Sequence, residues 1–187
     1  MSDFRSRIAV LDYGMGNLHS AAKALEHVAP GDHVVVTSDP LEVARADKVV
    51  FPGVGAIRDC MAEIRRLGFD QLVATAIAEK PVLAICVGMQ AVMQHSEENG
   101  GVEGLDILPG EVRYFGDDLR ASDGERLKVP HLGWNKVHQT IDHPGWHGIA
   151  QDTRFYFAPR YYVDAKQSRH VAATGESGPN FAARLVG

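Results

Sequence analysis

Cys86 is the residue whose sequence setting best fits covalent chemistry. It stands in Ala84-Ile85-Cys86-Val87-Gly88, where an apolar run meets the start of a helical pattern. Small residues two before and two after a nucleophile are typical of a nucleophile elbow, in which a strand turns sharply into a helix. Because an ordinary cysteine is only about 3% thiolate at pH 7, we expect the dipole of the following helix to favour ionisation.

A small buried apolar residue is the other interpretation of Cys86, since free cysteines are often buried. The pentapeptide alone leaves the two interpretations equally open. Cys60, the second cysteine, lies in the middle of a helical pattern with no comparable context. We therefore expect Cys60 to be structural.

A strand has to end just before Cys86 to present it, and the first half of the chain supplies a repeating pattern of strands and helices. Near-continuous apolar strands that alternate with helices predict an α/β fold with a mostly parallel central sheet and helices on both faces. Asn17 is the expected N-cap of the first helix. The expected strands are 8–11, 33–36, 48–51 and 82–85, and the expected helices are 18–28, 40–45, 57–67, 69–79 and 89–95.

The second half has a different character. From Gly110 onward the chain alternates short apolar runs with polar loops, which predicts a mixed or antiparallel part of the fold. No composition shift marks a linker, so we expect residues 1–187 to form one domain. The expected strands here are 111–115, 136–138, 155–157, 161–163, 171–174 and 182–185.

Two turns follow expected strands and are expected to lie near Cys86. They are residues 12–17 and Pro52-Gly53-Val54-Gly55. Because the carboxyl ends of parallel strands share one edge, both turns should open beside the cysteine. Gly-rich backbone beside a nucleophile can donate N–H groups to an oxyanion, although an ordinary strand-to-helix turn is the alternative for 52–55. Residues 12–17 lack the spacing of a dinucleotide or phosphate loop, which argues against nucleotide binding.

The bulk properties exclude several classes of function. A net charge of -5 without basic clusters gives no sign of nucleic-acid binding. No apolar run reaches the roughly 18 residues that span a bilayer, and we expect neither a membrane segment nor a signal peptide. Two cysteines make no disulfide framework, so we expect a cytoplasmic protein. The nine histidines lack metal-site spacing, and we expect no metal and no cofactor.

Four segments carry a family resemblance. They are Asp12-Tyr13-Gly14-Met15-Gly16-Asn17-Leu18, Pro52-Gly53-Val54-Gly55-Ala56, Ile85-Cys86-Val87-Gly88-Met89-Gln90 and Pro130-His131-Leu132-Gly133-Trp134-Asn135. Together they resemble the glutaminase subunit of imidazole glycerol phosphate synthase, a class I (triad-type) glutamine amidotransferase. The match runs through nearly the whole chain, and it implies the flavodoxin-like fold of that class.

The resemblance implies a reaction and a partner. Cys86 would attack the side-chain amide carbon of glutamine, ammonia would leave, and water would hydrolyse the thioester to glutamate. The ammonia would pass to a (βα)₈-barrel cyclase subunit, the partner in a heterodimer, for histidine biosynthesis. The implied residues are Gly53, Val54 and Val87 for the oxyanion, Gly55, Gln90, Glu98 and Tyr161 for glutamine, and Asn17 and Trp134 for the partner face.

Three of these residues keep ordinary alternatives. Gln90 could be an exposed helix residue, and Glu98 could be a solvated surface charge. Trp134 could be a core aromatic. Taken singly, the functional interpretation is favoured for Gln90, one turn beyond the nucleophile, and the ordinary one for Glu98.

The sequence departs from the family pattern in two places. The family's His-Pro-Glu element near the C-terminus is not found, and a thiol nucleophile needs an oriented base. His143-Pro144 is the only His-Pro pair, but Gly145 follows it, and we do not expect it to be the base. Pro159-Arg160 stands where the family usually has His-Ser or His-Thr. We therefore expect a domain without the family's C-terminal segment, an unpaired apolar sheet edge, and weak or absent activity of the 187-residue chain.

Two further functions compete with a catalytic amidotransferase subunit. The first is a non-catalytic subunit that keeps the partner face, which the departures favour and the intact elbow disfavours. The second is another α/β enzyme with a cysteine elbow, such as a small-molecule hydrolase. That class would not be expected to carry Gly133-Trp134-Asn135.

Overall fold

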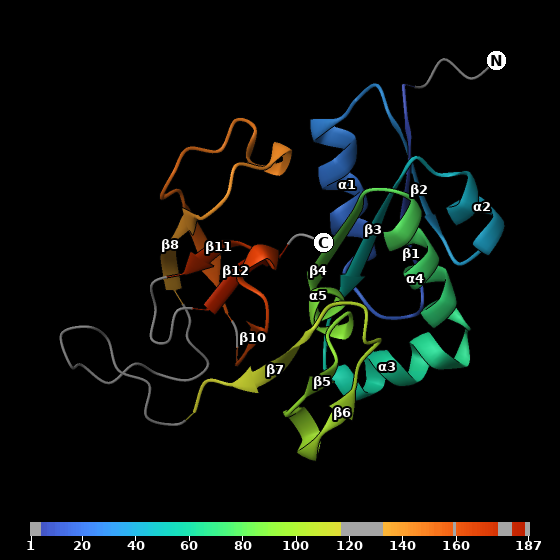
Figure 1. The fold of residues 1–187 in the computed structure, drawn as a ribbon. Helices are drawn as coiled ribbons and strands as arrows, with labels where there is room; N and C mark the ends of the chain where they lie inside the picture. The colour runs from blue at the N-terminus through green and yellow to red at the C-terminus, as the bar shows by residue number, and fades with distance from the viewer. Residues whose placement is uncertain (1–4, 117–132, 159, 176–180, 186–187) are drawn as a thin grey trace. The chain divides into compact units, whose positions relative to one another are not determined.

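The computed structural model describes residues 5–116, 133–158, 160–175 and 181–185, which belong to two compact units, Met1–Val92 and Met93–Gly187 (Figure 1). The prediction of a single domain stays a prediction. The first unit contains β1 (Arg7–Leu11), α1 (Leu18–Val28), β2 (His33–Thr37), α2 (Pro40–Arg45), β3 (Lys48–Gly53), α3 (Ile57–Arg66), α4 (Phe69–Glu79), β4 (Val82–Cys86) and α5 (Val87–Ala91). The second contains β5 (His95–Ser96), η1 (Glu98–Gly100), β6 (Val102–Glu103), β7 (Gly110–Tyr114), β8 (Gly133–Gln139), η2 (Pro144–Trp146), β9 (Arg154–Phe157), β10 (Tyr161–Ala165), η3 (Ser168–His170), β11 (Val171–Gly175) and β12 (Phe181–Leu185).

The first unit is built on a parallel sheet with strand order β2-β1-β3-β4. Alternate residues of its inner strands point to opposite faces. Ile8, Val10 and Val50 pack under α1 on one face. On the other face, the rings of Phe51 and of Phe69 from α4 both pack against the ring of Tyr13. The prediction of a mostly parallel sheet with helices on both faces is confirmed, and the strands are almost wholly apolar because both faces are covered.

The edge of this sheet at β4 is more exposed than its centre. Leu83 is 50% exposed and Ile85 is 40% exposed. In the part of the chain that the structure describes, β3 is the only strand that pairs with β4. The expectation that a missing C-terminal segment leaves an apolar edge unpaired stays a prediction.

Three expectations about the elements of the first unit need correction. The third strand does not end at Phe51, because β3 continues in register with β4 through Gly53. The expected helix 89–95 is wrong, since α5 starts directly after Cys86 and ends at Ala91. Asn17 occupies the N-cap position of α1, but its side chain makes no capping hydrogen bond.

The second unit contains two small sheets of its own. One has the order β10-β7-β5-β6, in which only β5 and β7 are parallel, and the other is antiparallel with the order β12-β11-β8-β9. Pairing of β5 with β7 and β6 explains why His95 is in a strand rather than a helix. The core of the antiparallel sheet is Val137, Trp146, Ala172 and Ala173. The prediction of a mixed or antiparallel second half is confirmed.

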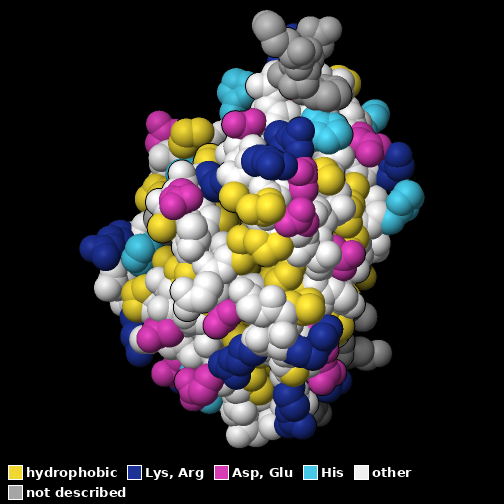
Figure 2. Space-filling view, turned by 90° about the vertical axis from the view of Figure 1, so that its right-hand side faces the viewer, with side chains coloured by type: hydrophobic (Ala, Val, Ile, Leu, Met, Phe, Trp, Pro, Cys, Tyr) yellow, Lys and Arg dark blue, Asp and Glu magenta, His cyan; other side chains and the backbone are white. Residues whose placement is uncertain are grey.

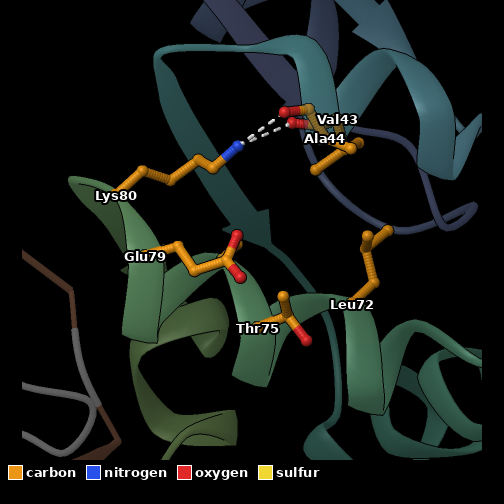
Figure 3. A pocket seen from close by; sticks show the side chains of 7 residues that line it. Val43, Ala44, Leu72, Thr75, Glu79 and Lys80 are labelled. Atoms are coloured by element: carbon orange, nitrogen blue, oxygen red, sulfur yellow. Dashed lines mark hydrogen bonds between the residues drawn. The ribbon is translucent and has the colours of Figure 1, made fainter.

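Lys80 fixes α2 against α4 at the amino ends of the strands. Its Nζ donates to the carbonyl oxygens of Val43 (3.3 Å), Ala44 (2.9 Å) and Ala46 (2.9 Å), as Figure 3 shows for the first two. These carbonyls lie at the C-terminal end of α2, where that of Val43 also accepts from the Ala46 N–H, and a cation there complements the helix dipole. The shallow apolar cavity beside Lys80 therefore belongs to helix packing, at the opposite end of the sheet from Cys86.

The surface in Figure 2 carries mixed charge. On that face, the described Lys and Arg side chains (dark blue) are interspersed with Asp and Glu (magenta). Within the described ranges, no helix combines the length and the apolar character needed to cross a membrane.

Candidate active site

Cys86 is the last residue of β4 and the residue before α5. Its backbone angles are φ 56° and ψ −118°. A positive φ at a residue other than glycine costs about 1–3 kcal/mol of conformational energy, and it persists only where the surrounding structure imposes it. The thiol is also exposed. The interpretation of Cys86 as a buried apolar residue is therefore wrong, and the backbone has the strained turn of an elbow.

The end of β3 lies against this elbow. Gly53 pairs directly with Cys86 in the parallel register. A Cβ atom on Gly53 would lie 2.9 Å from the carbonyl carbon of Val87, and a Cβ on Gly88 would overlap the carbonyl oxygen of Phe51. Both positions need glycine because backbone approaches backbone here. The sheet thus brings Gly53 and the residue after it, Val54, beside Cys86 and Val87.

The two predicted turns lie beside each other at this edge. A Cβ on Gly16 would lie 3.3 Å from the ring of Pro52, and one on Gly55 would lie 3.4 Å from the Cε of Met15. Both glycines have positive φ, 128° and 83°, a conformation that suits glycine. The argument from shared strand ends therefore placed these turns correctly.

Two buried donors lie beneath the turn at 52–55, and sequence reasoning missed their role. The Tyr13 hydroxyl donates to the Pro52 carbonyl at 2.7 Å. The Cys60 thiol, from α3, donates to the Val54 carbonyl at 3.2 Å. Burial raises the pKa of both groups, Tyr13 more strongly, so both keep their protons near neutral pH. A tyrosine just past an apolar strand was the only signal available in the sequence.

The predicted glutamine-binding residues divide between the two units. In the first, Gly55 lies in the turn after β3, and Gln90 is half-buried on α5. In the second, Glu98 is half-buried at the start of η1, and Tyr161 begins β10 with its ring 5.5 Å from that of Tyr114. Half-burial argues against the ordinary alternatives for Gln90 and Glu98. Their binding roles stay predictions.

The predicted partner-face residues are both exposed. Asn17 is exposed at the start of α1. Trp134 is 64% exposed on β8, so its interpretation as a core aromatic is wrong. Its ring meets that of Tyr156 edge-on at 5.7 Å, and Tyr156, directly opposite on β9, is itself 57% exposed. Sequence reasoning did not single out Tyr156, because its pairing with Trp134 depends on the strand register.

Of the residues at which the sequence departs from the family pattern, the structure describes His143 and Arg160. His143 Nδ1 accepts a hydrogen bond from the Gly145 N–H at 3.0 Å and so caps η2. The expectation that His143 is not the base stays a prediction. Arg160 is exposed, and its carbonyl accepts from the Phe115 N–H, whereas Pro159 lies outside the described residues.

We expect Gly88→Ala to destabilise the first unit strongly, by at least about 2 kcal/mol, because the new methyl group would overlap the Phe51 carbonyl. Urea unfolding followed by circular dichroism measures the effect. Gly31→Ala is the matched control, since its methyl group would meet only the flexible Arg5 side chain at 3.3 Å; we expect a change within about 0.5 kcal/mol. Equal effects of the two substitutions would contradict the close approach of β3 and α5.

Comparisons with known proteins agree with this geometry. Residues 9–184 match the family described as glutamine amidotransferase class-I. Among curated relatives, the imidazole glycerol phosphate synthase subunit HisH of Pseudomonas putida is 61% identical over 179 residues, which are 96% of this chain and 84% of the relative. The HisH subunit of Methylococcus capsulatus is 50% identical over 182 residues, which are 97% of this chain and 84% of that relative.

Solved structures support the fold alone. A glutamine amidotransferase crystal structure has a TM-score of 0.62 at 13% identity, covering 89% of this chain and 79% of that one. The structure of PurLQS from Thermotoga maritima has a TM-score of 0.59 at 17% identity, covering 97% of this chain and 80% of that one. The family match and the high identity to the relatives decide the assignment. The chain belongs to the class I glutamine amidotransferase family and, within it, to the HisH subunits of imidazole glycerol phosphate synthase.

Proposed function

We propose that Cys86 is the nucleophile with which this glutaminase subunit hydrolyses glutamine. The observation that carries the proposal is the strained backbone of Cys86 at the strand-to-helix turn, with its thiol exposed. Gly53, which pairs with Cys86, places the turn after β3 beside the thiol. Nucleophile and Gly-rich backbone therefore lie where an amide substrate could meet both.

The reaction follows from this arrangement. Cys86 Sγ bonds to the amide carbon of glutamine, and the carbonyl electron pair moves to oxygen as an oxyanion. The backbone N–H groups of Gly53, Val54 and Val87 are the candidate donors to that oxygen. The C–N bond then breaks, the nitrogen leaves as ammonia after taking up the proton that the Cys86 thiol lost on attack, and a γ-glutamyl thioester remains. Water attacks the thioester and releases glutamate and the thiol.

Glutamine itself needs polar partners around its α-carbon. We assign this role to Gln90 and Gly55, and the family resemblance implies the same role for Glu98 and Tyr161. A carboxylate such as that of Glu98 suits an ammonium group, and the Gln90 amide can donate and accept. These assignments rest on the family resemblance and on the half-burial of the Gln90 and Glu98 side chains.

The strain at Cys86 also distinguishes catalysis from a purely binding function. A subunit that only bound its partner would gain nothing from a non-glycine residue at positive φ, which costs about 1–3 kcal/mol. Glycine would relieve that cost. We therefore favour the catalytic function over the purely binding one, and the expectation that residues 1–187 have weak activity stays a prediction.

The Cys86 assignment predicts the outcome of a labelling experiment. An electrophilic glutamine analogue should alkylate the peptide that contains Cys86, glutamine should slow this labelling, and Cys86→Ala should abolish both labelling and glutaminase turnover. Peptide mass spectrometry and glutamate release measure the two effects. Cys60→Ser is the control for the second thiol and should still be labelled. Labelling that glutamine does not slow, or turnover by Cys86→Ala, would contradict the assignment.

The relatives are subunits of imidazole glycerol phosphate synthase, and we propose that this chain delivers its ammonia to the (βα)₈-barrel cyclase subunit of that synthase. The exposed pair Trp134 and Tyr156 supports a partner surface on the β8–β9 hairpin. Aromatic residues are enriched among the anchors of protein interfaces. Exposed Asn17 is the candidate contact in the first unit.

We expect Trp134→Ala to weaken association with the cyclase subunit by about 1–3 kcal/mol, because truncating an aromatic anchor typically has that cost. Tyr156→Ala should weaken it as well, and the two effects should not add, because the rings are in contact. Isothermal titration calorimetry gives the affinities. Leu41→Ala, an equally exposed apolar residue on α2, is the control and should leave the affinity unchanged. Unchanged affinity in Trp134→Ala would place the interface elsewhere.

A further inference from the structure

The turn after β3 has to keep a backbone N–H directed at the oxyanion, yet its sequence favours a flexible backbone. Two of the four residues in Pro52-Gly53-Val54-Gly55 are glycine, and Gly55 has a φ of 83°. Glycine has the widest choice of backbone conformations. A preorganised oxyanion site therefore needs anchors outside the turn itself.

Tyr13 and Cys60 each donate a hydrogen bond to a backbone carbonyl of this turn. The Tyr13 hydroxyl holds the carbonyl of Pro52 at 2.7 Å, and the Cys60 thiol holds the carbonyl of Val54 at 3.2 Å. Each carbonyl belongs to a planar trans peptide whose N–H points the opposite way. Holding the Pro52 and Val54 carbonyls inward therefore turns the N–H groups of Gly53 and Gly55 outward.

The peptide between these two anchored planes carries the N–H of Val54. With the planes on either side held, the main freedom left to this peptide is rotation about the axis that joins the Cα atoms of Gly53 and Val54, which turns its N–H without moving the two anchored planes. We propose that Tyr13 and Cys60 are positioning residues for glutamine hydrolysis: by holding the two outer peptides of the 52–55 turn, they fix the axis about which the Val54 N–H can turn toward the developing oxyanion. This inference rests on the proposed function of Cys86.

The anchors are themselves rigid. Both side chains are fully buried. The Tyr13 ring packs against Phe51 at 5.5 Å and Phe69 at 6.2 Å between centroids, and Cys60 lies within α3. Because burial raises the pKa of the phenol and of the thiol, both remain hydrogen-bond donors across the working pH range. Phenylalanine in place of Tyr13 and alanine in place of Cys60 would fill similar space without donating a hydrogen bond. These substitutions therefore remove the hydroxyl and the thiol, the groups to which we assign the positioning role.

The test compares Tyr13→Phe, Cys60→Ala and Cys60→Ser in the enzyme assembled with its synthase partner. For Tyr13→Phe and Cys60→Ala we expect kcat for glutamine hydrolysis to fall about tenfold or more, with KM changed less than about twofold, because the lost interaction acts in the transition state. Cys60→Ser keeps a donor and should recover kcat to within about threefold of the parent.

A second readout separates oxyanion stabilisation from thiol reactivity. A glutamine-like γ-aldehyde adds reversibly to Cys86: Sγ bonds to the aldehyde carbon, and the thiol proton ends on the oxygen, which takes the oxyanion position. Its affinity should fall in Tyr13→Phe and Cys60→Ala by about the same factor as kcat. Alkylation of Cys86 by iodoacetamide forms no oxyanion, so its rate should stay within about twofold of the parent.

Val73→Ala is the control for general destabilisation, since Val73 is buried on α4 and has no hydrogen-bonding side chain. It should lower the melting temperature without lowering kcat or the aldehyde affinity. Unchanged kcat and aldehyde affinity in folded Tyr13→Phe and Cys60→Ala would overturn the proposal. Losses of kcat in Val73→Ala or in Cys60→Ser as large as those in Tyr13→Phe and Cys60→Ala would overturn it as well. Turnover by Cys86→Ala would instead show that the proposed nucleophile is wrong, a result independent of the other variants.

Discussion

The close approach of two backbone segments, the end of β3 and the start of α5, is the constraint on which the candidate site depends. Gly53 lies opposite Cys86 in the sheet register, and Gly88 leaves room for the Phe51 carbonyl. No side chain larger than hydrogen fits at either glycine. Pairing of β4 with β3 therefore sets the positions of the nucleophile, the turn after β3 and the first residue of α5.

This constraint explains why the local strain at Cys86 persists. A positive φ at a non-glycine residue is unfavourable by itself, so the residues around it have to impose it. Strand pairing of β4 with β3 does so on one side, and helix formation from Val87 does so on the other. The Tyr13 and Cys60 contacts anchor two peptides of the 52–55 turn in addition. Because α5 has only five residues, its dipole is a smaller part of the site than the longer expected helix implied.

The sequence allowed the fold class to be predicted because its apolar runs and helical periods repeat regularly through residue 86. The Ala84–Gly88 spacing also predicted the turn at Cys86. The expected helix at 89–95 was wrong because the local pattern cannot reveal that His95 pairs with Glu111 on β7. Tyr13 and Tyr156 were missed for a related reason, because their partners Pro52 and Trp134 come from distant segments. Cys60 was missed although Val54 is only six residues away, because the contact depends on how the turn folds back over α3. Chemistry carried by one local motif was predictable, whereas the contacts that position it needed the tertiary structure.

The central claim is that Cys86 carries the acyl group of glutamine between two chemical steps, and acid quenching during turnover tests it most directly. Quenched enzyme with its partner present is digested and its peptides are weighed by mass spectrometry. We expect a γ-glutamyl adduct on the peptide that contains Cys86, formed within one turnover and absent from the peptide that contains Cys60. Steady glutamate release with an adduct on Cys60, or with no adduct at Cys86 when the hydrolysis step is slowed, would contradict it.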